Sequence, residues 1–214
     1  MNAEQREQES IRDAVRRIER DLGLTAGFLE NLRDQDDWSF VIKIHAIFEA
    51  ATAHLLCQVL QREELAEALS FLELSDKRRG KIAFVAALGL LEKADRRFIS
   101  SLSELRNSLV HDVRNSTFNL SEHVGRMDGP TLKQFAKNFN SFSMSPDEMV
   151  WLGDQQVSSE EAFRRDPKTA LWWSATCTLS LIYHAREIER ATADAKRYAL
   201  VLTTFSRWLR PAGE

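Results

Sequence analysis

The sequence predicts an all-α protein of one domain, folded as an antiparallel helical bundle with an elaborated C-terminal region and a long final helix. Apolar residues recur at spacings of three and four along most of the 214 residues, which is the period of helices with one buried face. Only eight glycines and four prolines are present, so we expect long helices and few tight turns. The hydrophobic share of 43% is that of a globular protein.

Composition argues against several classes of function. The formal net charge is −3, so the chain as a whole lacks the basic character of a nucleic-acid-binding protein, and any such contact needs a local patch. Residues 1–20 are too polar for a secretory signal peptide. No apolar run approaches the length of a membrane span. Cys57 and Cys177 lie in apolar segments and are expected to be buried free thiols. We therefore expect a cytoplasmic protein that does not cross a membrane.

In the first third of the chain, the pattern predicts three helices. The first covers about 3–22 and the second about 25–34. Asp36 and Asp37 are candidates to cap the third, which covers 38–60 and is apolar nearly all round. A helix of that kind usually forms the buried centre of a bundle.

In the middle of the chain, a short amphipathic segment over 62–71 precedes a helix that Ser75 is expected to cap and that continues to Leu91. The next helix covers about 92–111. Its apolar residues repeat with the period of one buried face: Phe98, Leu102, Leu105 and Leu109. Because the connection between these two helices is short, we expect them to be antiparallel neighbours.

The C-terminal part is expected to hold a helix over about 130–139 that begins with proline, and a turn of helix with a capping box that starts at Ser158. Between these two, either residues 145–148 start a helical turn or residues 149–152 form a short strand. The longest helical pattern covers about 168–210, with a polar section at 186–196 that could be a bend or a break.

Arg106, Asn107 and His111, near the end of the helix over 92–111, are the candidate catalytic residues. Asn107 and His111 are four positions apart and therefore stack on one side of the helix, away from its apolar face. Arg106 lies about 140° around the helix from His111 at 3.6 residues per turn. One copy of this helix cannot easily direct both side chains at one small target, whereas two facing copies can. The spacing therefore favours a composite site in a homodimer.

Polar residues of the helix over 38–60 could support this site. His45, Glu49 and Thr52 form one stripe at positions i, i+4 and i+7. A His-x-x-x-Glu pair can ligate a metal, but no third or fourth ligand occurs at a compatible spacing, so we expect neither a metal nor another cofactor. The stripe is either a polar pair with partners inside the bundle or a support beneath Arg106.

The densest basic cluster in the chain lies at the expected start of the helix that ends at Leu91. It consists of Lys77, Arg78, Arg79 and Lys81. A run of this kind is most often a solvated face. Cations at a helix N-terminus are slightly unfavourable, however, which gives some weight to a role in contacting RNA phosphates.

The order Arg106-Asn107-Ser-Leu-Val-His111, at the end of an apolar-striped helix and behind an antiparallel helical pair, resembles the HEPN superfamily of all-helical domains. The signature of that superfamily is an arginine, a polar residue directly after it, and a histidine after four to six intervening residues. The resemblance covers about 38–115, and the helix over 167–210 could close the bundle. Many such domains are metal-independent endoribonucleases that act as dimers, either as toxins or as effectors of phage defence.

For this chain, the resemblance implies cleavage of RNA to 2′,3′-cyclic phosphate ends. His111 would act as general acid and base, because the ordinary pKa of an imidazole, about 6.5, lies near neutral pH. Arg106 would bind the phosphate with two nitrogens and stabilise the developing charge. Asn107 would orient the imidazole or contact the ribose, and Glu49 would position Arg106. A toxin of this kind is also expected to have an antitoxin partner that covers the site.

Two alternatives stay open, so the sequence does not decide whether the protein is an enzyme. The stretches Ser39–Leu56 and Leu102–Asp112 also resemble the mannitol operon repressor family, whose members are helical regulators in which nuclease activity is not expected. Alternatively, His111 only caps a helix end, where a cation is favourable, and Arg106 pairs with Glu49 or Asp112 to hold helices together.

Overall fold

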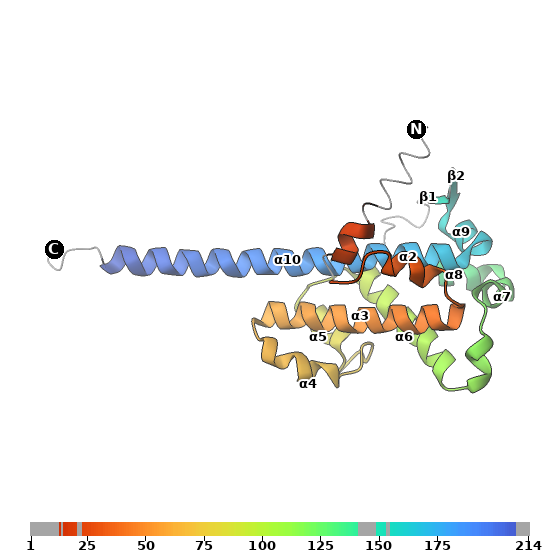
Figure 1. Ribbon diagram of the computed structural model, residues 1–214, viewed down its shortest axis with the longest axis horizontal. Coiled ribbons are helices and arrows are strands. Elements are labelled where there is room, and N and C mark those ends of the chain that lie inside the picture. Colours follow the sequence, from red (N-terminus) through yellow and green to blue (C-terminus); the bar gives the residue numbers. More distant parts are fainter. Residues whose placement is uncertain (1–12, 14, 21–22, 141–148, 153–154, 209–214) are drawn as a thin grey trace.

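The computed structural model describes residues 13–208 except 14, 21–22, 141–148 and 153–154. Most of these residues are helical, which confirms the all-α class (Figure 1). In chain order the elements are α2 (Phe28–Arg33), α3 (Asp37–Leu60), η1 (Glu63–Leu65), α4 (Ala66–Ser70), α5 (Lys81–Ala87), α6 (Lys93–Val110), η2 (Val113–Thr117), α7 (Leu120–Gly125), α8 (Gly129–Phe139), β1 (Met149–Leu152), β2 (Gln155–Ser158), α9 (Ser159–Arg165) and α10 (Pro167–Trp208). Of the first expected helix, the described stretch 15–20 is helical.

Helix α3 lies at the centre of the fold. Asp36 caps it, because its carboxylate accepts a hydrogen bond from the Ser39 N–H at 2.8 Å. The helix packs against α10 on one side and against α5 and α6 on the other (Figure 1). Among the described residues, α3 is the one helix long and apolar enough to cross a membrane, but 61% of its apolar window is buried inside the protein. The apolar character of α3 is explained by its burial in the core, as the sequence predicted for a central helix.

Helix α6 forms a second wall of the core. Glu92 and Asp95 make a reciprocal capping box at its start. All four apolar residues that predicted its buried face are buried: Phe98, Leu102, Leu105 and Leu109. The helix ends at Val110, and His111 is its C-cap residue. The candidate catalytic residues therefore lie on the last turns of a helix that the core holds firmly.

Helices α7, α8 and α9 close one end of the bundle around aromatic rings. Phe139 of α8 contacts Phe98 of α6 edge to face, with 5.7 Å between the ring centroids. Strands β1 and β2 form an antiparallel hairpin in which Met149 lies opposite Ser158. Strand β1 corresponds to the strand considered for 149–152, whereas no pattern indicated β2.

The segment from Ser75 to Gly80 is not the first turn of a helix, so the expectation that Ser75 caps a helix is wrong. The segment forms turns in which the Asp76 carboxylate accepts hydrogen bonds from the N–H groups of Arg78 and Arg79, at 2.8 and 2.9 Å. Helix α5 begins only after Gly80 and is much shorter than expected. The turn closes with a hydrogen bond from the Gly80 N–H to the Asp76 carbonyl at 2.9 Å, and the Lys81 N–H then bonds to the Glu73 carbonyl at 2.9 Å, so the backbone folds back on itself before α5 begins.

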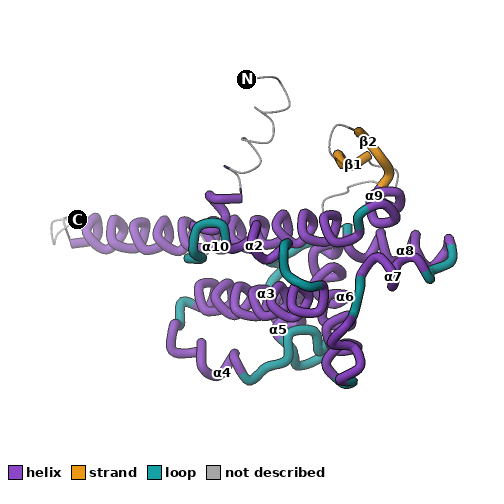
Figure 2. Tube along the Cα trace, turned by 45° about the vertical axis from the view of Figure 1, so that its right-hand side comes forward, coloured by secondary structure: helices purple, strands orange, loops and turns teal. Residues whose placement is uncertain are grey.

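Helix α10 is a single helix of 42 residues. The polar section at 186–196 is helical throughout, so it is neither a bend nor a break. The first half of α10 packs on α2, α3, α7 and α9, and Trp172 donates a hydrogen bond from Nε1 to the Leu29 carbonyl at 2.7 Å. The last buried residue of α10, among those described, is Ile182. Ala185 still packs against the core and Arg186 lines a groove with α3; further along, α10 projects from the body as a rod (Figures 1 and 2).

Candidate functional site

The three motif residues occupy different environments on α6. Arg106 is half-buried, whereas Asn107 and His111 are exposed. The Nη1 of Arg106 donates a hydrogen bond to Oδ1 of Asn107, at 3.0 Å. Within the described protomer no hydrogen bond joins Arg106 to His111, which fits their separation of about 140° around the helix.

Arg106 lies near a buried histidine of α3. The Nε2 of His45 is 3.1 Å from the Oγ of Ser103, which lies one turn before Arg106. The Ser103 hydroxyl donates its own hydrogen to the Ile99 carbonyl, at 3.1 Å, so it accepts the hydrogen of Nε2. This chain of hydrogen bonds requires a hydrogen on Nε2 of the imidazole.

The electrostatic surroundings of His45 favour the neutral form of its imidazole. Burial lowers the pKa of His45 most, and the positive charge of Arg106 lowers it further. Lys81 acts in the same direction, whereas the carboxylate of Glu49 opposes these effects. His45 is therefore uncharged near neutral pH, and it adds no positive charge beside the Arg106 guanidinium.

Glu49 is paired with Lys81 rather than with Arg106. The Nζ of Lys81 lies 2.9 Å from Oε1 of Glu49 and donates a second hydrogen bond to the Leu72 carbonyl, at 2.6 Å. The Lys81 side chain is 0% exposed, while that of Glu49 is 39% exposed. The expectation that Lys81 contacts RNA phosphates is therefore wrong, because its ammonium is enclosed by protein. Glu49 likewise does not hold Arg106 by a direct ion pair.

Asp112 binds Arg114 and not Arg106, the arginine considered in the sequence analysis. Its carboxylate accepts hydrogen bonds from the Nε and Nη2 of Arg114, at 2.9 and 2.6 Å. These contacts lower the pKa of Asp112 and raise that of Arg114. Across the part of the chain that the structure describes, Arg106 forms no ion pair with a carboxylate. The idea that Arg106 ties helices together through Glu49 or Asp112 therefore does not hold.

Lys77, Arg78 and Arg79 are exposed in the turn before α5. They belong to a different segment from the motif residues of α6. Because Lys81 is buried, these three exposed residues are the basic candidates for phosphate contacts that remain from the cluster.

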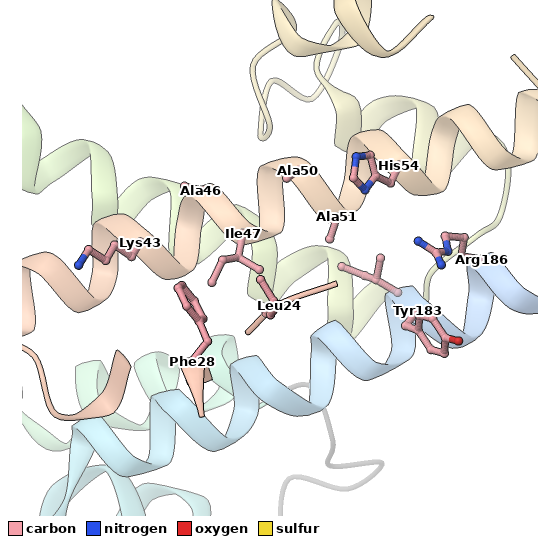
Figure 3. A pocket seen from close by; sticks show the side chains of 11 residues that line it. Leu24, Phe28, Lys43, Ala46, Ile47, Ala50, Ala51, His54, Tyr183 and Arg186 are labelled. Atoms are coloured by element: carbon pink, nitrogen blue, oxygen red, sulfur yellow. The ribbon is translucent and has the colours of Figure 1, made fainter. Parts of the chain in front are cut away.

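Two hollows lie on the described surface, and one of them adjoins the helix that carries the motif. A polar pocket of about 380 Å³ adjoins the C-terminal end of α6. Its polar lining comes from α6, η2 and α7: Ser108, Arg114, Asn115, Glu122, His123 and Arg126. An apolar groove of about 460 Å³ lies between α3 and α10 (Figure 3). Arg106 and His111 line neither hollow, so one protomer does not enclose a cleft around both of them.

Sequence reasoning missed Ser103 and Arg114. Ser103 precedes Arg106 by three positions and so lies on a neighbouring part of the α6 surface, a spacing that could have indicated that both face α3 near His45. Arg114 follows Asp112 by two positions and forms an ion pair with its carboxylate. Its role was not visible in the helical pattern because the pairing forms in the short η2 segment.

Among the described residues, no three His, Cys, Asp or Glu side chains are grouped so that they could hold a metal ion. His45 and Glu49 have partners of their own in Ser103 and Lys81. Comparisons with protein-family models, curated proteins and solved structures found no match to this chain. The conclusions about function therefore rest on the arrangement of these residues.

Proposed function

We propose that the protein is a metal-independent endoribonuclease of the HEPN type, with a composite site formed by Arg106, Asn107 and His111 of two protomers. One observation carries the proposal. The Arg106 guanidinium is half-buried on a helix anchored in the core, and it has no carboxylate partner within the described structure. A guanidinium held in this way is suited to bind a phosphate, because its donors match the phosphate oxygens.

In the proposed reaction, the 2′-oxygen of a ribose attacks the neighbouring phosphorus while one His111 takes up the hydroxyl proton. The bond to the 5′-oxygen breaks, and the His111 of the second protomer donates a proton to that oxygen. The products are a 2′,3′-cyclic phosphate and a free 5′-hydroxyl. Arg106 stabilises the charge on the phosphate oxygens as it develops, and its hydrogen bond to Asn107 fixes the guanidinium in place.

The test measures RNA cleavage by purified wild type, Arg106→Ala and His111→Ala, each with a chelator present. Each substitution should lower the rate at least about 100-fold, the usual effect of removing a general acid or base or a transition-state cation. Arg126→Ala and His184→Ala are matched controls, because both residues are exposed and lie outside the motif. Circular dichroism should show unchanged helix content in all four variants. Cleavage that survives both motif substitutions would overturn the proposal.

A second candidate is a non-catalytic regulator that works through protein contacts, as in the mannitol operon repressor family. The projecting half of α10 favours it, since Ile188 and Tyr198 are 64% and 71% exposed there. Overexpression separates the two functions. A ribonuclease toxin should slow growth and degrade total RNA, and His111→Ala should abolish both effects. Coexpression of an antitoxin partner should suppress both effects in wild type. A regulator should leave RNA intact in wild type and variant alike.

A further inference from the structure

The groove between α3 and α10 is a hollow of about 460 Å³ with a mainly apolar lining. Its walls come from α3, from α10 and from residues 24–28, which lead into α2 (Figure 3). Sites for small molecules typically have volumes of roughly 300–1,000 Å³ and an apolar lining with a few polar groups. The groove therefore has the size and the lining of a site for a small amphipathic molecule.

Small side chains of α3 keep the groove open to solvent. Ala46 and Ala50 are one helical turn apart, and both are exposed although they line the groove. Beside them, Phe28 and Ile47 stay only half-buried. An alkyl chain in the groove would remove these apolar surfaces from water, which is favourable.

The charged groups of the lining are all basic. The lining includes Lys43, His54 and Arg186 and contains no aspartate or glutamate. Figure 3 shows His54 and Arg186 toward one end of the groove and Lys43 toward the other. The Lys43 ammonium already donates a hydrogen bond to Oε1 of Gln35, at 2.5 Å. Charge complementarity therefore favours an anionic group at the end where α3 contributes His54 and α10 contributes Arg186.

Arg186 is positioned at that end with hydrogen-bond donors to spare. Its guanidinium carbon lies 5.2 Å from the centroid of the Tyr183 ring, and its side chain is 29% exposed. Its Nη2 lies 3.5 Å from Oε1 of Glu187, which is a long contact that uses only one nitrogen of the guanidinium. The other donors of the guanidinium can bind both oxygens of a carboxylate.

We propose that this groove binds a free long-chain carboxylate, that is, a fatty acid. The carboxylate lies at Arg186 and His54, and the alkyl chain runs along Ala50 and Ile47 toward Phe28. The stretch of α3 from Lys43 to His54 is roughly 16 Å long at 1.5 Å per residue. An extended alkyl chain advances about 1.25 Å per carbon when its bonds are about 1.5 Å long, so about twelve carbons span the groove.

The fatty-acid site is independent of the proposed ribonuclease. The groove lies where α3 faces α10, whereas His45 contacts Ser103 of α6 and lies near Arg106. His111→Ala should therefore bind a fatty acid as wild type does. Failure of the cleavage assay leaves the groove proposal standing, and failure of fatty-acid binding leaves the ribonuclease standing.

The role of Arg186 is tested by titration calorimetry of the full chain with dodecanoate, below the concentration at which this acid forms micelles. Arg186→Gln has a matched control in Arg190→Gln, which removes the same charge from an exposed residue one turn further along α10, outside the lining. Wild type and the control should bind one dodecanoate per chain with affinities within about twofold, whereas Arg186→Gln should bind at least about tenfold more weakly, because it loses charge-assisted hydrogen bonds. Dodecanol, which has the same chain without the charge, should also bind wild type at least about tenfold more weakly. Equal losses in both arginine variants, or dodecanol that binds as well as dodecanoate, would overturn the proposal.

The position of the alkyl chain is tested with Ala50→Trp, which fills the groove with an indole. Its control is Ala195→Trp, at an exposed alanine of α10 outside the lining. Circular dichroism should show unchanged helix content in both variants. Ala50→Trp should abolish dodecanoate binding, and Ala195→Trp should leave it unchanged. The proposal is refuted if wild type does not bind dodecanoate, or if Ala50→Trp binds it as well as wild type does.

Sedimentation with vesicles of phosphatidylglycerol distinguishes a free fatty acid from a lipid surface. The chain should stay in the supernatant, because the groove holds one alkyl chain and a single head group. Retention on the vesicles without binding of dodecanoate would assign the groove to membrane lipid and would refute the proposal.

Discussion

The Lys81 ammonium lies entirely inside the protein, where it is bound by Glu49 and the Leu72 carbonyl. The burial of Lys81 could not be predicted from its neighbours in the sequence, because Lys77, Arg78 and Arg79 belong to an exposed turn. Both partners come from other segments, and Glu49 lies 32 positions away. By contrast, Asp36 was predictable as a cap because its hydrogen-bond partner, Ser39, is only three positions away.

Removing the carboxylate from this pair should destabilise the fold. Glu49→Gln leaves a buried ammonium without its counter-charge and is expected to lower the free energy of unfolding by about 2 kcal/mol, less than for a fully buried pair because water reaches Glu49. Glu49→Gln/Lys81→Met should recover most of that loss. The control is Glu122→Gln, which breaks the exposed pair with Arg126 and should change stability by less than about 0.5 kcal/mol. Urea denaturation measures all three, and an equal effect at both pairs would contradict this account.

The lowered pKa of His45 makes a prediction about acid stability. As pH falls below about 6.5, the unfolded chain protonates His45 while the folded protein does not, because burial and Arg106 disfavour the imidazolium there. The unfolded state then binds more protons, so stability falls with pH by at most about 1.4 kcal/mol per unit. Wild type should therefore lose more stability between pH 7.5 and pH 5.5 than His45→Gln, which can keep a hydrogen bond to Ser103. Denaturation curves at the two pH values check this, and identical losses would exclude His45 as the cause.

Among the elements, α6 was the most predictable and the segment before α5 the least. Helix α6 has a clear apolar period and a capping box formed by Glu92 and Asp95, and both are local signals. The start of α5 was misplaced because the turn at 75–80 depends on a close approach of two pieces of backbone. A side chain on Gly80 would meet the carbonyl oxygen of Glu73 and the backbone nitrogen of Asp76, each at 2.6 Å.

A matched pair of glycine substitutions tests this close approach. Gly80→Ala should lower the free energy of unfolding by about 2 kcal/mol, because backbone atoms must move to make room for the methyl group. Gly125→Ala should leave it unchanged or raise it by no more than about 1 kcal/mol, since a methyl group there meets nothing within 4 Å and alanine favours helix. Thermal and urea unfolding of both variants give the comparison. A tolerated Gly80→Ala would mean that the 75–80 turn does not determine where α5 begins.

At the scale of the whole molecule, the sequence was sufficient to predict the class of fold and the long final helix. It was not sufficient to predict that this helix is continuous from the core into solvent. The polar section at 186–196 interrupts the apolar pattern, so the sequence alone left open a bend or a break there. The structure instead continues α10 straight through it. The candidate site shows the same division: the motif on α6 was visible in the sequence, whereas the environment of Arg106, with His45 and Ser103 beside it, depends on how α3 packs on α6.

The continuity of α10 has an energetic consequence. Its N-terminal half supplies part of the core, through Leu171, Ala175 and Leu179, and the same unbroken backbone continues into the exposed half. Extending a helix that already exists needs no new nucleus, so the core end acts as a template for the exposed end. Amide hydrogens near 190–198 should therefore exchange with solvent faster than those near 171–179, and melting of the bundle should remove the helix of both halves together.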